Sequence, residues 1–225
     1  RRFDGLIIAS SFILESDDAQ ATLARVQKRG LPVVELSENY GVDSSSVDYR
    51  EATVEVMKYL LSLGHRRIGL INGVAGHELA EDRILPYQAG LREAGIPFES
   101  ELITQCGTTI EDGYQAARIL LQLTLSPTAI IAINDLLAIG ALRAVSDLGL
   151  SVPNDISLVG FDDISMSNFL VPRLTTVSKD AYNLGKQAFD LLLARMQNPN
   201  LPRQVKHGTA KLIIRESTGP APKAK

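Results

Sequence analysis

The chain has 225 residues, of which 45% are hydrophobic and 22% charged, a balance typical of a globular protein. Its net charge of −3 and pI near 5.7 argue against a nucleic-acid-binding surface on this chain. The single cysteine, Cys106, excludes an intrachain disulfide and a cysteine-ligated zinc site, and we see no membrane-spanning apolar run and no signal peptide.

Apolar, β-rich runs alternate with helical segments from the start of the chain. In the first part, strands are predicted at 3–9 and 33–36, and helices at about 18–29 and 48–63. Residues 41–47 form a polar, serine-rich stretch without periodicity, which predicts a loop. Because the chain opens abruptly on a strand of buried type, we expect it to be a fragment of a longer protein.

The alternation continues to the end of the chain. Strands are predicted at 67–71, 102–106, 129–133, 156–160, 174–177 and 211–215. Helices are predicted at 79–94, 110–123 and 181–196, and between the strands 129–133 and 156–160. The strands are continuous apolar runs, as expected when helices cover both faces of a parallel sheet, and the fold class is therefore α/β. The breaks at 41–46 and 198–204 could be domain crossings, and 218–225 is typical of a disordered tail.

Polar residues gather where two neighbouring strands end. Asn134-Asp135 follows 129–133, and Asp162-Asp163 follows 156–160. In open α/β sheets, ligands bind at the carboxyl ends of the strands, so these residues indicate a place for a small molecule. Adjacent carboxylates on a strand point to opposite faces, which argues against a catalytic or metal-binding pair. We expect one aspartate to face a ligand and the other to cap the next segment; the alternative is two helix-capping aspartates.

Arg83 lies early in the helix 79–94, where a cation is unfavourable to the helix dipole. Either Arg83 pairs with Glu81 or Asp82, or it serves as a forked donor to a ligand in a cleft. We find no convincing nucleotide-binding glycine loop, no Gly-x-Ser-x-Gly elbow and no metal-ligand spacing among the histidines, and we expect neither a metal nor a cofactor.

The ordered set of motifs resembles the ligand-binding core of the lactose-repressor/galactose-repressor (LacI/GalR) family of bacterial transcription regulators. The motifs are FDGLII at 3–8, LGHRRI at 63–68, TAI at 128–130, NDLLAIGA at 134–141, VPNDISLVGFDD at 152–163, PRLTTV at 172–177 and IREST at 214–218. Each motif alone is weak, but they cover nearly the whole chain in the family's order.

The resemblance implies a periplasmic-binding-protein-like fold of two doubly wound parallel-sheet subdomains joined by three crossovers. The N-terminal subdomain would comprise 1–47 and 179–206 and be incomplete, and the C-terminal one 48–177 and 209–217. The family's DNA-binding headpiece would precede this chain, so DNA binding is implied for the parent protein only.

The resemblance also implies an effector site in the cleft between the subdomains. The matching positions are Arg83, Asn134, Phe161, Asp162, Ser10, Ser37 and Thr108, with Ala9 beside Ser10. Pro86 replaces a family glycine, and Thr108 stands where an aromatic residue is frequent. The expected ligand is a sugar or related metabolite, whose binding would change the hinge angle and operator affinity of a cytoplasmic repressor. The rival interpretations are a transport-type periplasmic sugar-binding protein and an α/β enzyme using Asp162 or Asp163.

The helical segment 136–142 is apolar around its whole circumference. One face can pack on the sheet, and the other needs a cover as well. A symmetric homodimer would supply it, and the resemblance places Ile139 and Leu170 at that contact. The alternative is a helix buried between elements of its own chain.

Overall fold

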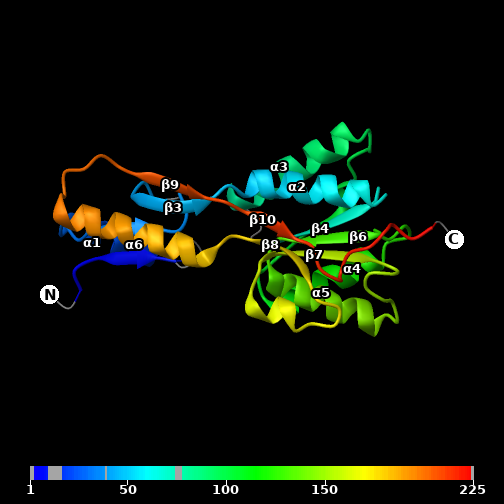
Figure 1. Ribbon diagram of the computed structural model, residues 1–225. Helices are drawn as coiled ribbons and strands as arrows, with labels where there is room; N and C mark the ends of the chain where they lie inside the picture. Colours follow the sequence, from blue (N-terminus) through cyan, green and yellow to red (C-terminus); the bar gives the residue numbers. More distant parts are fainter. Residues whose placement is uncertain (1–2, 10–16, 39, 74–77, 224–225) are drawn as a thin grey trace. The chain divides into compact units, whose positions relative to one another are not determined.

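The computed structural model describes residues 3–9, 17–38, 40–73 and 78–223 (Figure 1). The chain forms two compact units: unit 1 is Arg1–Asp48 with Lys179–Thr209, and unit 2 is Tyr49–Ser178 with Ala210–Lys225. It therefore passes between the units three times, and neither of the breaks predicted from the sequence is itself a crossing. Among the described residues, no helix has the length and apolarity needed to cross a bilayer.

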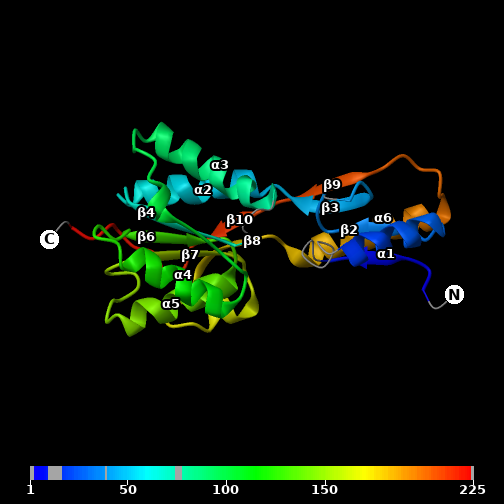
Figure 2. The same ribbon diagram turned by 180° about the vertical axis from the view of Figure 1, so that it is seen from behind.

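Unit 2 is built on a six-stranded sheet with the order β10-β8-β7-β6-β4-β5. The strands are β4 (Ile68–Gly73), β5 (Ile103–Cys106), β6 (Ala129–Ala132), β7 (Ser157–Asp162), β8 (Thr175–Ser178) and β10 (Lys211–Ile213). Neighbours are parallel except β10, which runs antiparallel to β8. Helices α2 (Tyr49–Ser62) and α3 (Glu78–Glu93) lie on one face, and α4 (Ile110–Leu121) and α5 (Asp135–Asp147) on the other (Figures 1 and 2). The predicted α/β fold with a parallel sheet is confirmed.

Consecutive strand residues of unit 2 enter two separate cores. Ile130 belongs to the cluster under α4 and α5, whereas Ile131 belongs to the cluster under α2 and α3. Leu158 and Val159 divide in the same way. Because successive side chains of a strand point to opposite faces, both must be apolar when both faces are covered. This is why the strands appear in the sequence as unbroken apolar runs.

Two glycines let α4 and α5 touch backbone to backbone. A Cβ atom on Gly140 would lie 2.0 Å from the carbonyl oxygen of Ile110, and one on Gly113 would lie 2.2 Å from the carbonyl oxygen of Leu137. Helix α4 therefore covers one side of α5, and the sheet covers another. Part of the apolar circumference of α5 is thus buried within its own chain, while Leu136 stays exposed and Ile139 half-buried.

Unit 1 holds a four-stranded parallel sheet with the order β1-β2-β3-β9. Its elements are β1 (Leu6–Ile8), α1 (Asp17–Lys28), β2 (Val33–Glu35), β3 (Asp43–Val47), α6 (Ala181–Gln197) and β9 (Val205–Gly208). The 3-10 helices η2 (Ser100–Leu102) and η3 (Ser165–Asn168) belong to unit 2. The prediction of a loop at 41–47 was wrong, because β3 is a buried strand. Two of its serine hydroxyls find partners: Ser45 donates to Gln187 of α6 at 3.0 Å, and Ser46 donates to Glu38.

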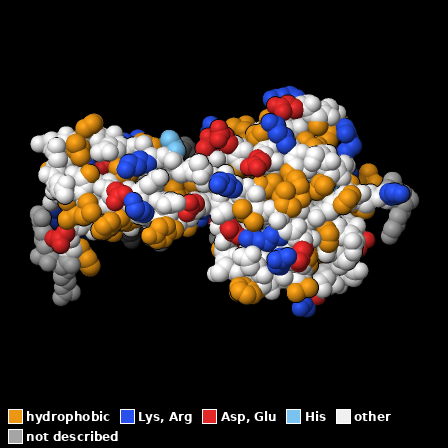
Figure 3. Space-filling view, in the orientation of Figure 1, with side chains coloured by type: hydrophobic (Ala, Val, Ile, Leu, Met, Phe, Trp, Pro, Cys, Tyr) orange, Lys and Arg blue, Asp and Glu red, His pale blue; other side chains and the backbone are white. Residues whose placement is uncertain are grey.

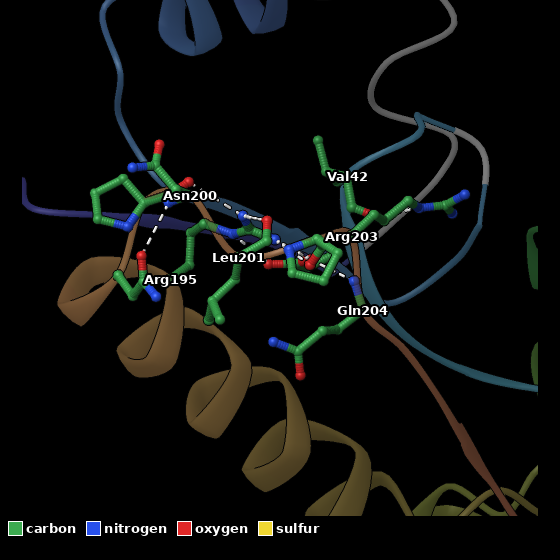
Figure 4. Close-up of polar contacts among 10 residues, drawn as sticks. Val42, Arg195, Asn200, Leu201, Arg203 and Gln204 are labelled. Atoms are coloured by element: carbon green, nitrogen blue, oxygen red, sulfur yellow. Dashed lines mark hydrogen bonds and ion pairs between the residues drawn. The ribbon is translucent and has the colours of Figure 1, made fainter.

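Asp43 and Arg195 fasten three segments of unit 1 together (Figure 4). Arg195, in the last turn of α6, contacts both carboxylate oxygens of Asp43 at 2.8 and 2.7 Å, and it also donates to the carbonyl oxygens of Pro199, Leu201 and Pro202. The backbone N–H of Gln204 donates to Asp43 at 2.8 Å. One ion pair therefore fixes the end of α6, the start of β3 and the turn that leads into β9.

Helix α6 presents a second apolar row on its outer side. The residues Tyr182, Phe189, Leu193 and Met196 are exposed, and their spacing places them on one face of the helix. The buried face of α6 is a different set that includes Leu184, Ala188, Leu191 and Leu192. In the space-filling view, hydrophobic side chains line the region of α6 (Figure 3).

The end of the chain is ordered as far as the structure describes it, so the prediction of disorder from Thr218 onward was wrong for these residues. Thr218 contacts the hydroxyls of Tyr59 at 2.8 Å and Thr175 at 3.0 Å. The N–H of Gly219 donates to Ser157 at 3.0 Å, and the N–H of Ala221 donates to the carbonyl oxygen of Leu63 at 2.9 Å. These partners are remote in sequence, which is why composition alone suggested a free tail.

Buried His65 should make the stability of unit 2 depend on pH. Its Nδ1 lies 2.9 Å from Thr128 Oγ1, and its Nε2 lies 3.0 Å from the carbonyl oxygen of Gly219. Burial lowers the pKa of His65 below its ordinary value of 6.5, against a smaller raising effect of the Gly219 carbonyl. The unfolded chain therefore takes up the proton first as the pH falls, and stability present above pH 6.5 is lost below it.

We expect the urea midpoint of unit 2 to fall between about pH 7.5 and 5.5, and His65→Gln to flatten this dependence. His207→Gln, at an exposed histidine in unit 1, is the control and should leave it unchanged. A wild-type midpoint that does not move over this range would contradict the prediction.

Candidate functional site

The predicted ligand residues of unit 2 follow the carboxyl ends of its parallel strands. Arg83 lies on α3, which follows β4, and Thr108 follows β5. Asn134 follows β6, and Phe161 and Asp162 end β7. Since these strands are parallel neighbours, the loops after them meet at one edge of the sheet, where ligands bind in folds of this class.

Arg83 is 8% exposed and lies against two aromatic rings. The carbon of its guanidinium is 3.9 Å from the ring centroid of Tyr49 and 4.9 Å from that of Phe161. The two rings are 6.3 Å apart and tilted by 58°. Stacking on aromatic faces holds the planar cation in one orientation, with donors that can reach a ligand edge-on. Tyr49 was missed in the sequence, since only the fold brings it from α2 to α3.

Asn134 and Thr108 are joined by a hydrogen bond. The Asn134 side chain caps α5 by accepting from the N–H of Leu137 at 2.7 Å, and its amide nitrogen donates to the carbonyl oxygen of Thr108 at 3.3 Å. The cap explains why the helix begins here. It also fixes the Asn134 side chain, so that the loops after β5 and β6 are held side by side.

Asp162 and Asp163 adopt left-handed backbone conformations, with φ values of 107° and 53°. Such angles are uncommon outside glycine and cost energy, so surrounding contacts must hold them. The Asp163 carboxylate forms a 2.6 Å ion pair with Arg215, which follows β10. We expected one of these aspartates to cap the next segment. The Asp163 carboxylate does not do so, because it forms this ion pair with Arg215 instead.

Asp135 is fully buried beside these groups, and the sequence did not reveal its role. Its carboxylate accepts hydrogen bonds from the N–H of Ile164 and from the hydroxyls of Ser167 and Thr176. Burial raises the pKa of Asp135, the three hydrogen bonds lower it, and the nearby charge of Asp162 raises it further, with a net upward shift. A Cβ atom on Gly160 would lie 2.3 Å from this carboxylate. Only glycine therefore fits at that point of β7.

The residues predicted in unit 1 are Ser10 and Ser37, with Ala9 beside Ser10. Ser10 lies outside the described residues. Ser37 donates at 2.7 Å to the carboxylate of Glu35, a fully buried residue that also accepts from the N–H of Tyr40 at 3.0 Å. Ala9 is exposed. Ser37 is thus engaged with its own loop.

Two hollows among the described residues lie away from these positions. One, of about 360 Å³, lies between α2 and α3 and is lined by residues such as Lys58, Gly90 and Glu93. The other, of about 530 Å³, lies in unit 1 at the amino ends of its strands and is lined by Asp43 and Arg195 among others. Neither includes a predicted ligand residue. Within the part of the chain that the structure describes, no three metal-ligating side chains gather at one point.

Comparison with known proteins identifies the family. Residues 57–218 match the model of the periplasmic binding protein-like domain. A solved LacI-family transcriptional regulator from Enterococcus faecium, with bound ribose, superposes with a TM-score of 0.83 at 30% identity, covering 98% of this chain and 81% of that one. The chain belongs to the LacI family. A second neighbour, the transcriptional regulator CelR in complex with cellobiose, has a TM-score of 0.85 at 26% identity, covering 95% and 65% of the two chains.

Curated relatives that are transcriptional repressors agree with this assignment. The chain is 34% identical over 200 residues to the HTH-type transcriptional repressor CytR of Escherichia coli K12, covering 87% of this chain and 59% of CytR. It is 30% identical over 221 residues to the HTH-type transcriptional repressor PurR of Haemophilus influenzae, covering 96% and 65% of the two chains. The chain thus spans about three fifths to two thirds of the length of these relatives.

Proposed function

We propose that this chain is the effector-binding core of a bacterial transcriptional regulator and that a sugar or related small metabolite binds at the carboxyl ends of the unit 2 strands. The observation that carries the proposal is Arg83, a buried forked donor whose guanidinium lies over the rings of Tyr49 and Phe161. Asn134 and Asp162 follow the neighbouring strands. A donor fork and oxygen acceptors suit the hydroxyls of a carbohydrate. The solved relatives bound to ribose and cellobiose support this ligand class.

Regulation requires that the effector bind one conformation better than another, since equal binding shifts no equilibrium. In the proposed mechanism, this preference changes the hinge angle and reaches DNA through a headpiece that is not part of this chain, in the cytoplasm. Contact of the effector with unit 1 through Ser10 and Ser37 stays a prediction. A transport-type binding protein is the alternative, and the repressor relatives favour the regulator.

We also propose that the chain is not an enzyme. Its relatives are regulators rather than enzymes, which supports this view. Asp163, a candidate acid or base in the sequence, is engaged by Arg215 at 2.6 Å, and Asp135 is buried in hydrogen bonds to neutral donors. These carboxylates hold the loop after β7 rather than form a nucleophile–base pair.

Asp162→Ala should weaken effector binding about tenfold or more, because losing a charged hydrogen-bond partner costs about 1.5–3 kcal/mol. A thermal-shift panel of sugars and nucleosides, including ribose and cellobiose, would identify the effector, and calorimetry would measure its affinity for the variant. Asp147→Ala, at an exposed carboxylate at the other end of α5, is the matched control. Unchanged affinity in Asp162→Ala would remove this residue from the site.

We further propose a two-fold homodimer in which Ile139 and Leu170 lie at or near the contact. Around Leu170 the side chains of Met166, Phe169 and Val171 are 54%, 83% and 92% exposed. Leu170 itself packs on the core cluster that includes the buried face of α5, which makes this patch continuous with that helix. The patch is apolar and uncharged, so a second copy of the same chain is a complementary partner for it.

Light scattering should therefore find a dimer, and Phe169→Glu should shift it towards monomer because a carboxylate would be buried without a partner. Ile139→Glu should act in the same direction, although its half-buried position makes Phe169 the cleaner site. Leu125→Glu, at a residue 67% exposed in the loop after α4, is the control and should stay dimeric. A wild-type monomer at high concentration would refute the dimer.

A further inference from the structure

Asp135 holds three groups at once. Its Oδ2 accepts from the N–H of Ile164 at 2.9 Å and from the hydroxyl of Ser167 at 2.6 Å. Its Oδ1 accepts from the hydroxyl of Thr176 on β8 at 2.5 Å. Ser167 and Thr176 are as fully buried as Asp135 itself. Hydrogen bonds to an ionised acceptor in a buried site are stronger than those between neutral groups. The Asp135 carboxylate therefore holds Ile164, Ser167 and Thr176 firmly in place.

Two of these groups belong to the loop that begins with Asp162. The strained backbone at Asp162 and Asp163 leads directly into Ile164, whose N–H Asp135 holds. Thr176 also accepts from the N–H of Asp163, at 3.4 Å. A strained conformation persists only where surrounding contacts hold it. The direction of the Asp162 side chain therefore depends on the Asp135 anchor.

Asp135 directly follows Asn134 in the chain. The Asn134 side chain is fixed by Leu137 and Thr108, so Asp135 begins its helix with a set position. Gly160 gives Asp135 the room to approach β7. The loops after β6 and β7, which carry two of the proposed ligand residues, are therefore joined through Asp135.

We propose that Asp135 is a positioning residue of the effector site, which sets Asn134 and Asp162 relative to each other without itself touching the ligand. The ligand in this statement rests on the proposed function. The anchoring of the loop does not, since it follows from the contacts of the chain alone. Removing the anchor should loosen residues 164–167 selectively and lower effector affinity, although no ligand contact is removed.

Amide hydrogen exchange of the full chain tests the anchor. In Asp135→Asn, exchange at 164–167 should become at least about tenfold faster relative to exchange at Val159 in the middle of β7, because a charged acceptor is lost. Ser167→Ala removes one donor, keeps the buried charge paired with two others, and should show a smaller selective increase. If Asp135→Asn fails to fold, Ser167→Ala alone tests whether Asp135 anchors the loop.

Asp155→Asn is the matched control. Asp155 likewise accepts from a backbone N–H and a serine hydroxyl, those of Ser151 at 2.9 and 2.6 Å, but it precedes β7 instead of following it. In Asp155→Asn, amide hydrogen exchange at 164–167 should be as fast as in the wild type. Exchange that quickens equally at Val159, or that stays unchanged at 164–167, would overturn the proposal.

Calorimetry with the effector from the panel gives the second readout. Asp135→Asn and Ser167→Ala should both weaken binding by about fivefold or more, and Asp155→Asn should not. Selective loosening with wild-type affinity would overturn the positioning role. If the panel yields no binder, the proposed function fails, and the exchange result still decides whether Asp135 holds the loop.

Discussion

Replacing Arg195 by methionine should lower the free energy of unfolding of unit 1 by about 3 kcal/mol. The change leaves the buried carboxylate of Asp43 without its cation, and breaking a buried ion pair by removing one partner typically costs about 3–5 kcal/mol. The lower end of that range applies because the Arg195 side chain is 18% exposed. Urea unfolding followed by circular dichroism would measure the loss. Exchange of the Ser44 amide, which donates to Gln204, would localise it.

The effect should depend on pH in a defined direction. Burial acts to raise the pKa of Asp43, but the hydrogen bonds from Arg195 and from the N–H of Gln204 outweigh it, and the pKa lies below its ordinary value of 3.8. The pair therefore stabilises the fold above that pH and loses its effect as the pH falls. The difference between Arg195→Met and the wild type should accordingly shrink on acidification below about pH 4.

Two controls distinguish the loss of the Asp43–Arg195 ion pair from a general effect of removing a positive charge. Arg143→Met removes an exposed partner of Asp147 on α5 and should change stability little. The double variant Asp43→Leu with Arg195→Met should recover much of the loss, since an apolar pair leaves no buried charge behind. If the double variant is as unstable as Arg195→Met alone, the isolated charge of Asp43 is not the cause.

Gly140→Ala should destabilise unit 2 by about 1–3 kcal/mol or more, the usual cost of overpacking. The new methyl group would lie 2.0 Å from the carbonyl oxygen of Ile110 and 2.5 Å from the amide nitrogen of Tyr114. Both obstacles are backbone atoms of α4 and cannot rotate away, so the two helices must separate. Thermal or urea unfolding would show the loss.

Gly185→Ala, on α6, is the matched control, and its effect on stability should have the opposite sign. Nothing lies within 4 Å of the position its Cβ would take, and alanine favours a helix over glycine by up to about 1 kcal/mol. This variant should therefore be as stable as the wild type or more so. An equal loss in both variants would show that the close contact between α4 and α5 does not explain the effect at Gly140.

The α/β fold could be predicted from the sequence because the strands of unit 2 are buried on both faces. Strand β3 could not be predicted. Serine has no preference for strands, and polar groups of β3 find partners more than a hundred residues away in the chain: Gln187 for Ser45, and Arg195 for Asp43. The order of Thr218–Ala221 was missed for the same reason, since Ser157 and Tyr59 are remote in sequence.

The sequence could point to Asn134 and Asp162 because both lie at the carboxyl end of a strand, and their contact with a ligand stays a prediction. Tyr49 and Asp135 were missed because their roles come from contacts that only the fold creates: a ring beneath Arg83, and hydrogen bonds to the loop after β7. The carboxylate of Asp135 beside the helix cap, followed by a glycine in the next strand, is the signal that could have indicated it.

The outer row of α6, with Tyr182, Phe189, Leu193 and Met196, is a second exposed apolar surface of the chain, besides the patch proposed for the homodimer. A molecule with two different self-complementary patches does not stop at a dimer: pairing through both in turn yields either a closed tetramer or an open fibre. If the α6 row also pairs with a second copy, light scattering of highly concentrated protein should show tetramers or larger assemblies beyond the dimer, and Phe189→Glu on this row should limit assembly to the dimer.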